Sequence, residues 1–356
     1  MITDIRLLDF RSYHDDSFEF SPSVNIIVGP NASGKTNLLE SILVIASGGS
    51  FRTKDIELIA HDRPWARLEA LVNNSDSRVV LLKRFGDRAN KQFKINDTPY
   101  ARLALTKKLP VVLFEPNHLD LIAGPPDVRR QFLDDSLEQM QPGYSILRRQ
   151  YARVLAQRNA LLKSRQTLLP DQLFVWNVRL SEFGQQIVQG RDRLVTAINS
   201  RLTELYRELS QVKATATIRY IGLAKPEVYA TELIKYLEKH QITDTERGFT
   251  GRGPHREDMQ ILLNGHPAAL TASRGESRTL ILAFKMIEAE LLEQARGNKP
   301  LLLFDDVFSE LDGHRRQALT RFLQPYQTFI TTTDADVVVQ HFAEETNVIP
   351  LSKETL

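Results

Sequence analysis

The sequence predicts an α/β fold: a P-loop head with a mixed sheet and an N-terminal antiparallel β part, into which a helical lever domain is inserted. Three observations support this prediction. An apolar strand, a glycine-rich loop and a helix follow one another at residues 24–46. A second apolar strand ends in two acids, Asp305 and Asp306. Between these motifs, residues 127–210 show an almost continuous helical spacing of apolar side chains.

The N-terminal elements come first. Residues 2–10 and 16–20 alternate polar and apolar side chains, which predicts two short strands. The run "SVNIIVG" predicts a strand covered on both faces, and a helix is expected from Lys35 onwards. Two strands joined by a polar turn are expected in "SRVVLLKRFGDRANKQFKINDT", and another buried strand in "LPVVLFEP".

Two long helices follow, separated by the short link "TLLP". Such a link favours antiparallel pairing of the helices. After them we expect, in order, the strand "KATATIRYI", a helix over 226–240, the strand "MQILLNG", a helix over 273–296, the strand "PLLLFDD", a helix from 312 and the strand "QTFITTT". The prediction therefore divides the chain into the N-terminal part of the head (1–122), the helical insertion (123–210) and the C-terminal part of the head (211–356).

Composition excludes several classes of protein. The 356 residues are 42% hydrophobic and 25% charged, which is typical of a globular chain. No cysteine is present, so disulfides, zinc thiolates, iron–sulfur clusters and thiol catalysis are excluded. The N-terminus resembles neither a signal nor a transit peptide, and no apolar stretch approaches the ~20 residues of a membrane span. We expect a soluble, cytoplasmic protein with no membrane partner.

The glycine-rich loop predicts a phosphate-binding site. Backbone N–H groups of such a loop and the positive end of the following helix both point at an anion. Lys35 is expected to reach the β- and γ-phosphates and the Thr36 hydroxyl to ligate Mg²⁺. The nucleotide-contacting residues predicted here are Gly29, Pro30, Asn31, Ala32, Ser33, Gly34, Lys35, Thr36 and Asn37.

The acid pair supplies the second half of this site. Asp305 is expected to hold the metal, and Asp306 to orient or deprotonate the attacking water, so that Lys35 and Asp306 are the predicted catalytic residues. Roughly 270 residues separate the loop from this pair, more than the ~100–150 residues of a common domain. The head is therefore expected to combine both ends of the chain.

Six segments together resemble the RecF family of recombination-mediator ATPases, which are related to the heads of SMC proteins. They are "DFRSY" (9–13), "VGPNASGKTNLLESI" (28–42), "SFRT" (50–53), "GPHRED" (253–258), "SRGE" (273–276) and "SELD" (309–312). "SRGE" is similar to the signature motif of ABC-type ATPases and "SELD" to their D-loop. The resemblance covers nearly the whole chain.

This resemblance implies a function. Ser273 and Gly275 would contact the γ-phosphate of ATP held by a second copy, so that ATP would join two chains around two composite sites. Arg11 and Arg52 would lie near the nucleotide. The implied partners are double-stranded and gapped DNA and the mediators RecR and RecO, with recombinase loading as the outcome. Independently, Ser273 is placed to be a helix N-cap.

Some positions differ from the ABC pattern. Glu276 stands where the signature usually has glutamine, Ala32 where glycine is commoner, and the switch histidine falls near Thr333 and Asp334. No clear Q-loop glutamine follows "VVLFEP". These differences predict slow ATP hydrolysis, and the resemblance to the RecF family implies that DNA stimulates it.

Two basic patches are candidates for DNA contact, because net charge is only +2 and binding must be local. The first is a face of the helix after Gly143, with Arg148, Arg149, Arg153 and Lys163. The second is the predicted strand pair, with Arg78, Lys83, Arg84, Arg88, Lys91 and Lys94. The sequence does not choose between them and shows no base-reading motif.

Other functions remain open at this point. A transport cassette of the ABC type would need a membrane partner and would lack the long helical insertion. An ATP-gated clamp without a repair role would differ mainly in turnover. A nuclease-linked SMC relative would need a further catalytic domain, and a P-loop kinase would lack the signature and D-loop segments.

Overall fold

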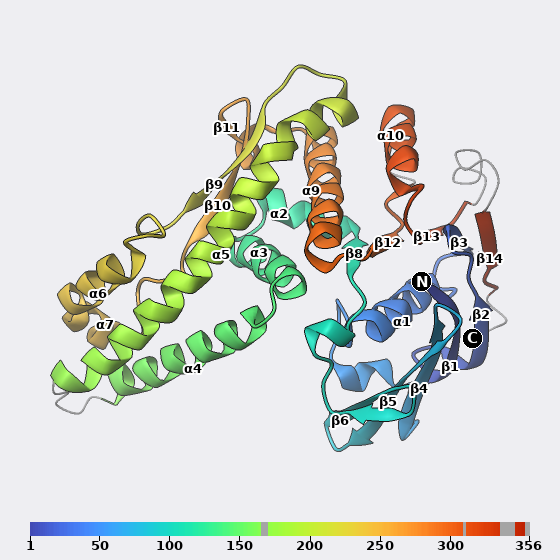
Figure 1. Ribbon diagram of the computed structural model, residues 1–356, viewed down its shortest axis with the longest axis horizontal. Coiled ribbons are helices and arrows are strands. Elements are labelled where there is room, and N and C mark those ends of the chain that lie inside the picture. The colour runs from blue at the N-terminus through green and yellow to red at the C-terminus, as the bar shows by residue number, and fades with distance from the viewer. Residues whose placement is uncertain (165–169, 309–310, 335–345, 353–356) are drawn as a thin grey trace. The chain divides into compact units, whose positions relative to one another are not determined.

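The computed structural model describes residues 1–164, 170–308, 311–334 and 346–352. Its elements form two compact units (Figure 1). Unit 1 comprises 1–118 and 288–356, and unit 2 comprises 119–287. The N-terminal and C-terminal parts of the sequence therefore both contribute to unit 1. The long separation in sequence between the glycine loop and the acid pair implied this.

Unit 1 contains two sheets. The first is antiparallel, in the order β2-β1-β4-β5-β6-β7. Its strands are β1 (Ile2–Phe10), β2 (Tyr13–Glu19), β4 (Trp65–Val72), β5 (Asp76–Phe85), β6 (Arg88–Ile95) and β7 (Thr98–Tyr100). The second is parallel, in the order β14-β3-β13-β12-β8. Its strands are β3 (Val24–Val28), β8 (Val111–Phe114), β12 (Leu301–Asp305), β13 (Thr328–Thr332) and β14 (Thr346–Pro350).

Helix α1 (Lys35–Ser47) belongs to the core between these two sheets. Its apolar residues Leu38, Leu39 and Ile42 are fully buried in one cluster with residues of both sheets. The remaining elements of unit 1 are α10 (Gly313–Leu323) and the 3₁₀ turns η1 (Asp55–Leu58), η2 (Leu105–Lys107) and η3 (Pro116–Leu119), the last at the unit boundary.

Unit 2 is built on helices. These are α2 (Asp120–Ala123), α3 (Pro126–Met140), α4 (Tyr144–Lys163), α5 (Pro170–Ser210), α6 (Tyr229–Lys239), α7 (Gln241–Arg247) and α8 (Ala268–Thr271). A small sheet in the order β11-β10-β9 contains β9 (Ala216–Ile221), β10 (Asp258–Leu263) and β11 (His266–Pro267). Helix α9 (Arg274–Arg296) begins in unit 2 and ends in unit 1.

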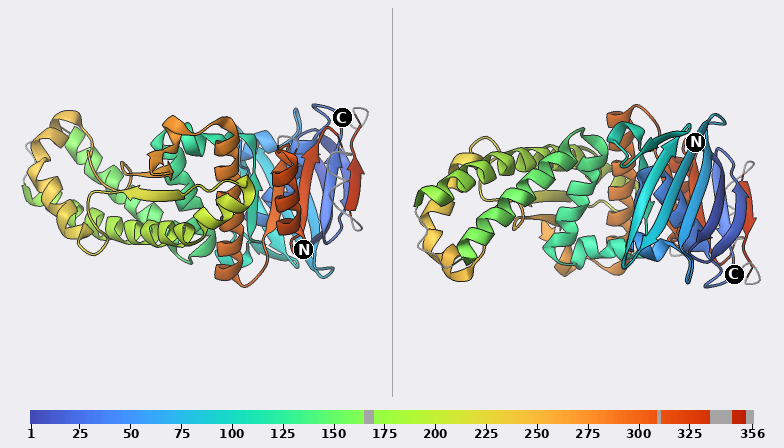
Figure 2. Two further views of the ribbon diagram at one scale, coloured as in Figure 1. Left: turned by 90° about the horizontal axis from the view of Figure 1, so that it is seen from above. Right: turned by 90° about the horizontal axis from the view of Figure 1, so that it is seen from below.

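Helices α4 and α5 lie side by side and run in opposite directions (Figures 1 and 2). Their antiparallel pairing agrees with the prediction. The helical segment was expected to end at residue 210, whereas unit 2 continues to Ile287. The reason is that β9 packs against α5 and pairs with β10, so these strands join the helices in one unit.

Several differences from the expected elements concern strands, among them the short strands β7 and β11, which were not predicted. β2 begins at Tyr13 and not at residue 16, because Tyr13 already pairs with Phe10 across a tight turn. Strands β4 and β14 were not predicted, although "WARLEALV" alternates exposed and buried side chains. No helix in the described ranges is long and apolar enough to cross a membrane.

Candidate nucleotide site

The glycine-rich loop connects β3 to α1 in unit 1, as expected. Gly34 adopts a left-handed backbone with φ 91°, and a side chain there would come within 2.8 Å of the Tyr13 hydroxyl. A side chain at Gly29 would come within 2.5 Å of the Leu351 carbonyl oxygen. Both glycines are therefore required by close approach of their neighbours. The Ser33 hydroxyl in this loop is buried and has no hydrogen-bond partner. It could therefore donate a hydrogen bond to a bound anion.

Lys35 lies over this loop. Its Nζ donates to the carbonyl oxygens of Gly29 and Pro30 at 2.7 and 2.9 Å. The residue is 8% exposed, and burial lowers the pKa of its ammonium against the attraction of Asp306 and Asp305. The lysine is thus held by weak neutral acceptors, which an incoming phosphate would outcompete.

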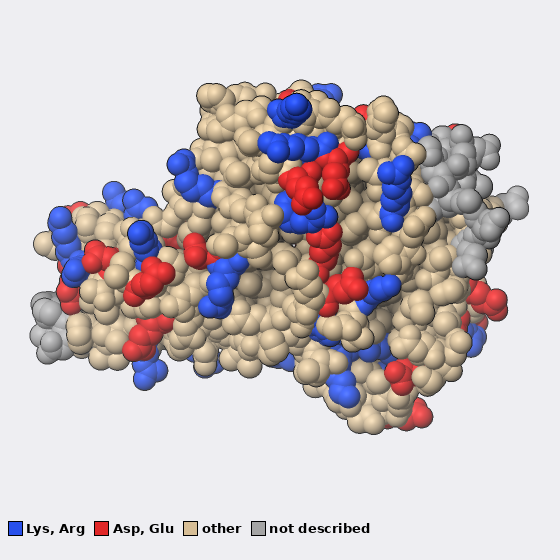
Figure 3. Space-filling view, turned by 45° about the horizontal axis from the view of Figure 1, so that its top comes forward, with Lys and Arg blue, Asp and Glu red and all other residues tan. Residues whose placement is uncertain are grey.

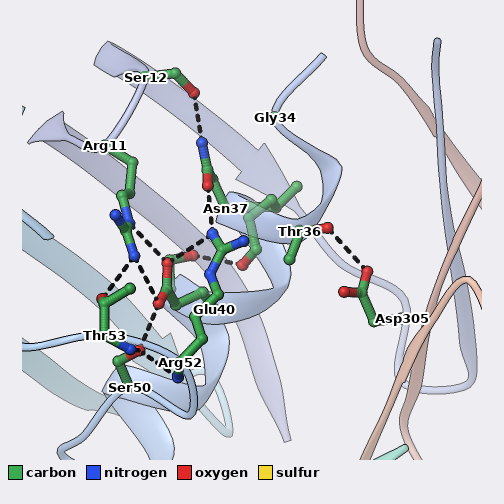
Figure 4. Close-up of polar contacts among 12 residues, drawn as sticks. Arg11, Ser12, Gly34, Thr36, Asn37, Glu40, Ser50, Arg52, Thr53 and Asp305 are labelled. Carbon is green, nitrogen blue, oxygen red and sulfur yellow. Dashed lines mark hydrogen bonds and ion pairs between the residues drawn. The ribbon is translucent and has the colours of Figure 1, made fainter. Parts of the chain in front are cut away.

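Thr36 and Asp305 meet at the carboxyl edge of the parallel sheet. The Thr36 hydroxyl donates to Asp305 Oδ1 at 3.0 Å (Figure 4). Strands β3 and β12 are separated only by β13, whose Thr331 hydroxyl donates to the same oxygen at 2.8 Å. A hydroxyl and a carboxylate at this spacing match the hard oxygen ligands that Mg²⁺ prefers.

Asp306 follows in an unusual conformation. Its φ is 53°, which is rare for a residue with a side chain, and its N–H donates to Thr331 Oγ1 at 2.9 Å. Thr331 therefore orients both acids. Ser309 and Glu310 of the predicted D-loop lie outside the described residues. The described residues form no cluster of three or more acids and histidines, so a cation here would depend on other ligands such as phosphate.

A buried carboxylate lies one turn further along α1 (Figure 4). The side chain of Glu40 is 0% exposed and accepts four hydrogen bonds. Arg11 Nε and Nη2 donate at 2.9 and 3.1 Å, Arg52 Nη2 at 2.9 Å and Ser50 Oγ at 2.5 Å. Burial alone would raise the pKa of Glu40, but these hydrogen bonds hold it below its usual value.

Two arginines share this one carboxylate, which leaves an excess positive charge beside the glycine loop. Arg52 also donates to Asn37 Oδ1 at 2.6 Å, and Asn37 in turn donates to Ser12. These side chains line a pocket of about 810 Å³ in unit 1. The pocket therefore offers cationic and amide groups, together with the carboxylates of Glu57 and Asp87, near the start of α1, where Lys35 and Thr36 lie.

Ser273 caps α9 in unit 2. Its hydroxyl accepts from the Glu276 N–H at 3.2 Å, while Glu276 Oε2 accepts from the Ser273 N–H at 2.8 Å. This reciprocal pair is a capping box, and its hydrogen bonds lower the pKa of Glu276. The N-cap prediction for Ser273 is confirmed. Ser273 and Arg274 are exposed and Gly275 half-buried, so the start of the helix is open to a second molecule.

The "GPHRED" segment has a structural role in unit 2. Glu257 accepts hydrogen bonds from the hydroxyls of Tyr220 and Tyr229, both at 2.6 Å, and from the Leu223 N–H. His255 Nδ1 lies 2.6 Å from the Tyr151 hydroxyl, and burial lowers the pKa of His255 to about 4. The segment thus joins α4, β9 and α6 through buried polar contacts.

In each of the two basic patches one member is paired with acids. On α4, Arg148 pairs with Asp134, Asp135 and Glu138. Arg149, Arg153 and Lys163 are exposed and form no ion pair with an acid among the residues that the structure describes. The buried Arg158, which is not part of this patch, pairs with Asp244. On the face drawn in Figure 3, basic and acidic side chains are intermingled. In the strand pair Lys91 pairs with Asp55, and its other basic residues form no ion pair with an acid within the part of the chain that the structure describes.

Comparison with known proteins agrees with this geometry. The family model for the RecF/RecN/SMC N terminal domain matches residues 1–354. The DNA replication and repair protein RecF of Heliobacterium modesticaldum is 35% identical over 342 residues, which cover 93% of this chain and 92% of that protein. The chain belongs to the RecF family.

Solved structures support the same assignment. A structure of the recombination mediator RecF with ATP in the RecFOR pathway has 30% identity and a TM-score of 0.84, covering 94% of this chain and 92% of that one. The Smc head domain of Pyrococcus furiosus has 17% identity and a TM-score of 0.52, covering 98% of this chain and 92% of that chain, which shows a shared fold. The predicted ABC-type head of the RecF and SMC kind is therefore confirmed.

Two residues of this RecF-family site, Glu40 and Thr331, were not predicted. Glu40 sits in the helical run "NLLESIL", where it looks like a solvated helix residue. Thr331, which contacts Asp305, was given no role. A polar residue ending a buried strand, as in "TFITT", is the signal that could have identified Thr331.

Proposed function

We propose that this chain is a DNA replication and repair ATPase that binds ATP with Mg²⁺, dimerises on ATP around two composite sites, and hydrolyses it slowly. The observation that carries this proposal is the contact of Thr36 with Asp305 beside the buried Lys35. The chain's membership of a family whose relatives include a RecF–ATP structure supports it further.

Each residue of the loop has a proposed task. Backbone N–H groups of the loop after Pro30 and of the start of α1 would bind the phosphates. Lys35 would exchange its carbonyl partners for phosphate oxygens. Thr36 and Asp305 would hold Mg²⁺, which would offset phosphate charge when bound. Asp306, exposed and held by Thr331, would accept the proton of the attacking water.

The composite site would need a second copy. The exposed start of α9, with the Ser273 hydroxyl and Gly275, offers hydrogen-bond donors suited to the phosphates of a nucleotide in the partner. Arg11, fixed by Glu40, would lie beside the nucleotide in its own chain. Glu276 in place of the usual glutamine would keep hydrolysis slow.

The proposed setting is the repair of gapped DNA in the cytoplasm. The chain would bind double-stranded and gapped DNA, act with RecR and RecO, and help to load recombinase. The RecFOR pathway named for a similar structure supports this setting. For DNA contact both basic patches stay candidates, because each keeps exposed cations that form no ion pair with an acid among the described residues: Arg149 and Arg153 on α4, and Lys83, Arg88 and Lys94 in the strand pair.

Light scattering with and without ATP tests the dimer. We expect the wild type to dimerise with ATP, and Lys35→Met and Ser273→Arg to stay monomeric. Ser75→Arg, an exposed serine in a turn of unit 1, is the matched control and should dimerise. A wild type that stays monomeric under every condition would remove the composite-site mechanism.

Phosphate release separates the alternatives. A repair ATPase should release phosphate faster when gapped duplex DNA is added. An ATP-gated clamp without a repair role would dimerise with ATP but show no DNA stimulation. A transport cassette would show neither DNA binding nor DNA stimulation.

A further inference from the structure

The antiparallel sheet of unit 1 has one face that packs on α1 and another that faces solvent. Along β4, Ala66, Leu68 and Ala70 are buried. Trp65, which precedes them, and Arg67, between Ala66 and Leu68, are exposed. Figure 2, right, looks onto the solvent face, where the blue to teal strands of this sheet lie in front. We call this solvent face of β4, β5 and β6 the outer face.

Two aromatic side chains project from the outer face: Trp65 at the start of β4 and Phe85 at the end of β5. Trp65 is 37% exposed and pairs with Lys83 of the neighbouring strand. Phe85 is 82% exposed and lies two residues beyond Lys83, on the same face. Diagonal neighbours in an antiparallel pair have Cα atoms about 7–8 Å apart, within reach of aromatic side chains. Because Phe85 is 82% exposed at a turn, it contributes nothing to the core, and core packing does not explain why a phenylalanine stands there.

The same face carries uncompensated positive charge. Lys83, Arg88 and Lys94 are exposed, and none of the three forms an ion pair with an acid among the residues that the structure describes. Arg88 pairs directly with Phe85 in the register, and Lys94 with Val79. The acids nearby are Glu69, which accepts from Arg67 at 2.6 Å, and Asp87 at the turn.

Exposed aromatic rings between unpaired cations match the chemistry of one partner. Single-stranded nucleic acids present flat unpaired bases along a regularly charged backbone, and proteins bind them by stacking bases on aromatic side chains and tracking phosphates with basic ones. Duplex DNA would use the cations but leave the rings without a role, since its bases are stacked on one another. A protein partner would not require the cations.

We propose that the outer face binds single-stranded DNA, with bases stacked on Trp65 and Phe85 and phosphates contacted by Lys83, Arg88 and Lys94. This inference rests on the proposed function in gap repair, because a gap supplies unpaired bases beside a duplex. It assigns the unpaired strand to this face, independently of the nucleotide site.

Tryptophan fluorescence provides the test. The chain contains two tryptophans, so Trp176→Phe leaves Trp65 as the sole reporter. Titration with a thymidine oligonucleotide of about 15 residues should quench its emission saturably, because a stacked base quenches an indole. Phe85→Ala should weaken binding about tenfold, within the range of one lost base stack. Changing Lys83 and Lys94 to Gln should reduce the slope of log affinity against log salt by about 1.4, at about 0.7 per phosphate contact.

The matched control is Phe174→Ala, which removes a phenylalanine 49% exposed on α5 of unit 2. It should bind the oligonucleotide like the parent. Thermal unfolding of each variant separates a lost contact from a lost fold, and Phe85 is too exposed to destabilise the sheet when removed.

Two results would overturn the inference: unchanged Trp65 emission at saturating oligonucleotide, as expected if a protein binds this face, or equal affinities for Phe85→Ala and Phe174→Ala. Failure of the proposed function looks different. It would appear as loss of ATP-dependent dimerisation in the wild type, whereas Lys35→Met should lose dimerisation and still show Trp65 quenching.

Discussion

Glu40 is the residue whose removal we expect to destabilise unit 1 most specifically. Glu40→Gln keeps the shape of a buried side chain but removes the charge that balances Arg11 and Arg52. Breaking a buried ion pair costs about 3–5 kcal/mol. The side chains of Arg11 and Arg52 are 17% and 34% exposed, so water recovers part of this loss, and we expect about 2–3 kcal/mol.

Urea denaturation in the Trp176→Phe background measures this effect, because Trp65 then reports on unit 1 alone. With a slope of about 2 kcal/mol per molar urea, the midpoint should fall by about 1 M or more. The matched control is Glu69→Gln, which removes a partly exposed carboxylate paired with Arg67 and should change stability by at most about 1 kcal/mol.

The pH dependence of the difference tests its cause. The carboxyl pKa of Glu40 is lowered in the folded state, so its stabilisation is complete above the unfolded value of about 4.3 and is lost as the pH falls through the lower folded value. The gap between wild type and Glu40→Gln should therefore be constant near neutral pH and shrink in acid. A gap no larger than that of Glu69→Gln, or one unchanged in acid, would refute this reasoning.

Three further predictions concern other sites. Asp306→Asn should retain ATP binding and dimerisation but release phosphate about 10²-fold more slowly or worse, and an unchanged rate would exclude Asp306 as the base. Ser273→Asp should keep the helix cap but repel phosphate, whereas Ser273→Ala should lose about 1 kcal/mol of stability. If the aspartate variant still dimerises with ATP, as judged by light scattering, the trans role of Ser273 is wrong. Burial lowers the pKa of His255 from the usual 6.5 to about 4. As the pH falls from 6.5 to 4, the unfolded state takes up a proton before the folded state does. The free energy of unfolding should therefore fall by up to about 3 kcal/mol over this range. His255→Gln, followed by Trp176 fluorescence in a Trp65→Phe background, should lose this slope.

The nucleotide site shows what local pattern and one topological rule could predict. The glycine loop and Asp305 each follow an apolar strand, and the carboxyl ends of parallel strands meet at one edge of a sheet, so their proximity could be expected. That β13 separates the two strands could not be read from either motif, because strand order depends on packing between distant segments.

Glu40 and Arg158 illustrate what the sequence leaves open. Arg158 of α4 is buried and paired with Asp244 from α7. Nothing in the local pattern named Asp244, which lies 86 positions away. Likewise, the partners of Glu40 come from a β-turn and a loop 29 and 10 to 12 positions away, and only the fold brings them together.

Strand β14 has a consequence for how this protein is made. It pairs with β3, and the Leu351 N–H donates to the Val28 carbonyl at 2.7 Å, directly before the glycine loop. A ribosome therefore releases the loop more than three hundred residues before its neighbouring strand. Contacts so distant in sequence form slowly, so a nascent chain would expose an unfinished β3 edge throughout most of its synthesis. Newly made chains should become competent for nucleotide only after β14 has been synthesised, and until then the open edge of β3 could be bound by a chaperone.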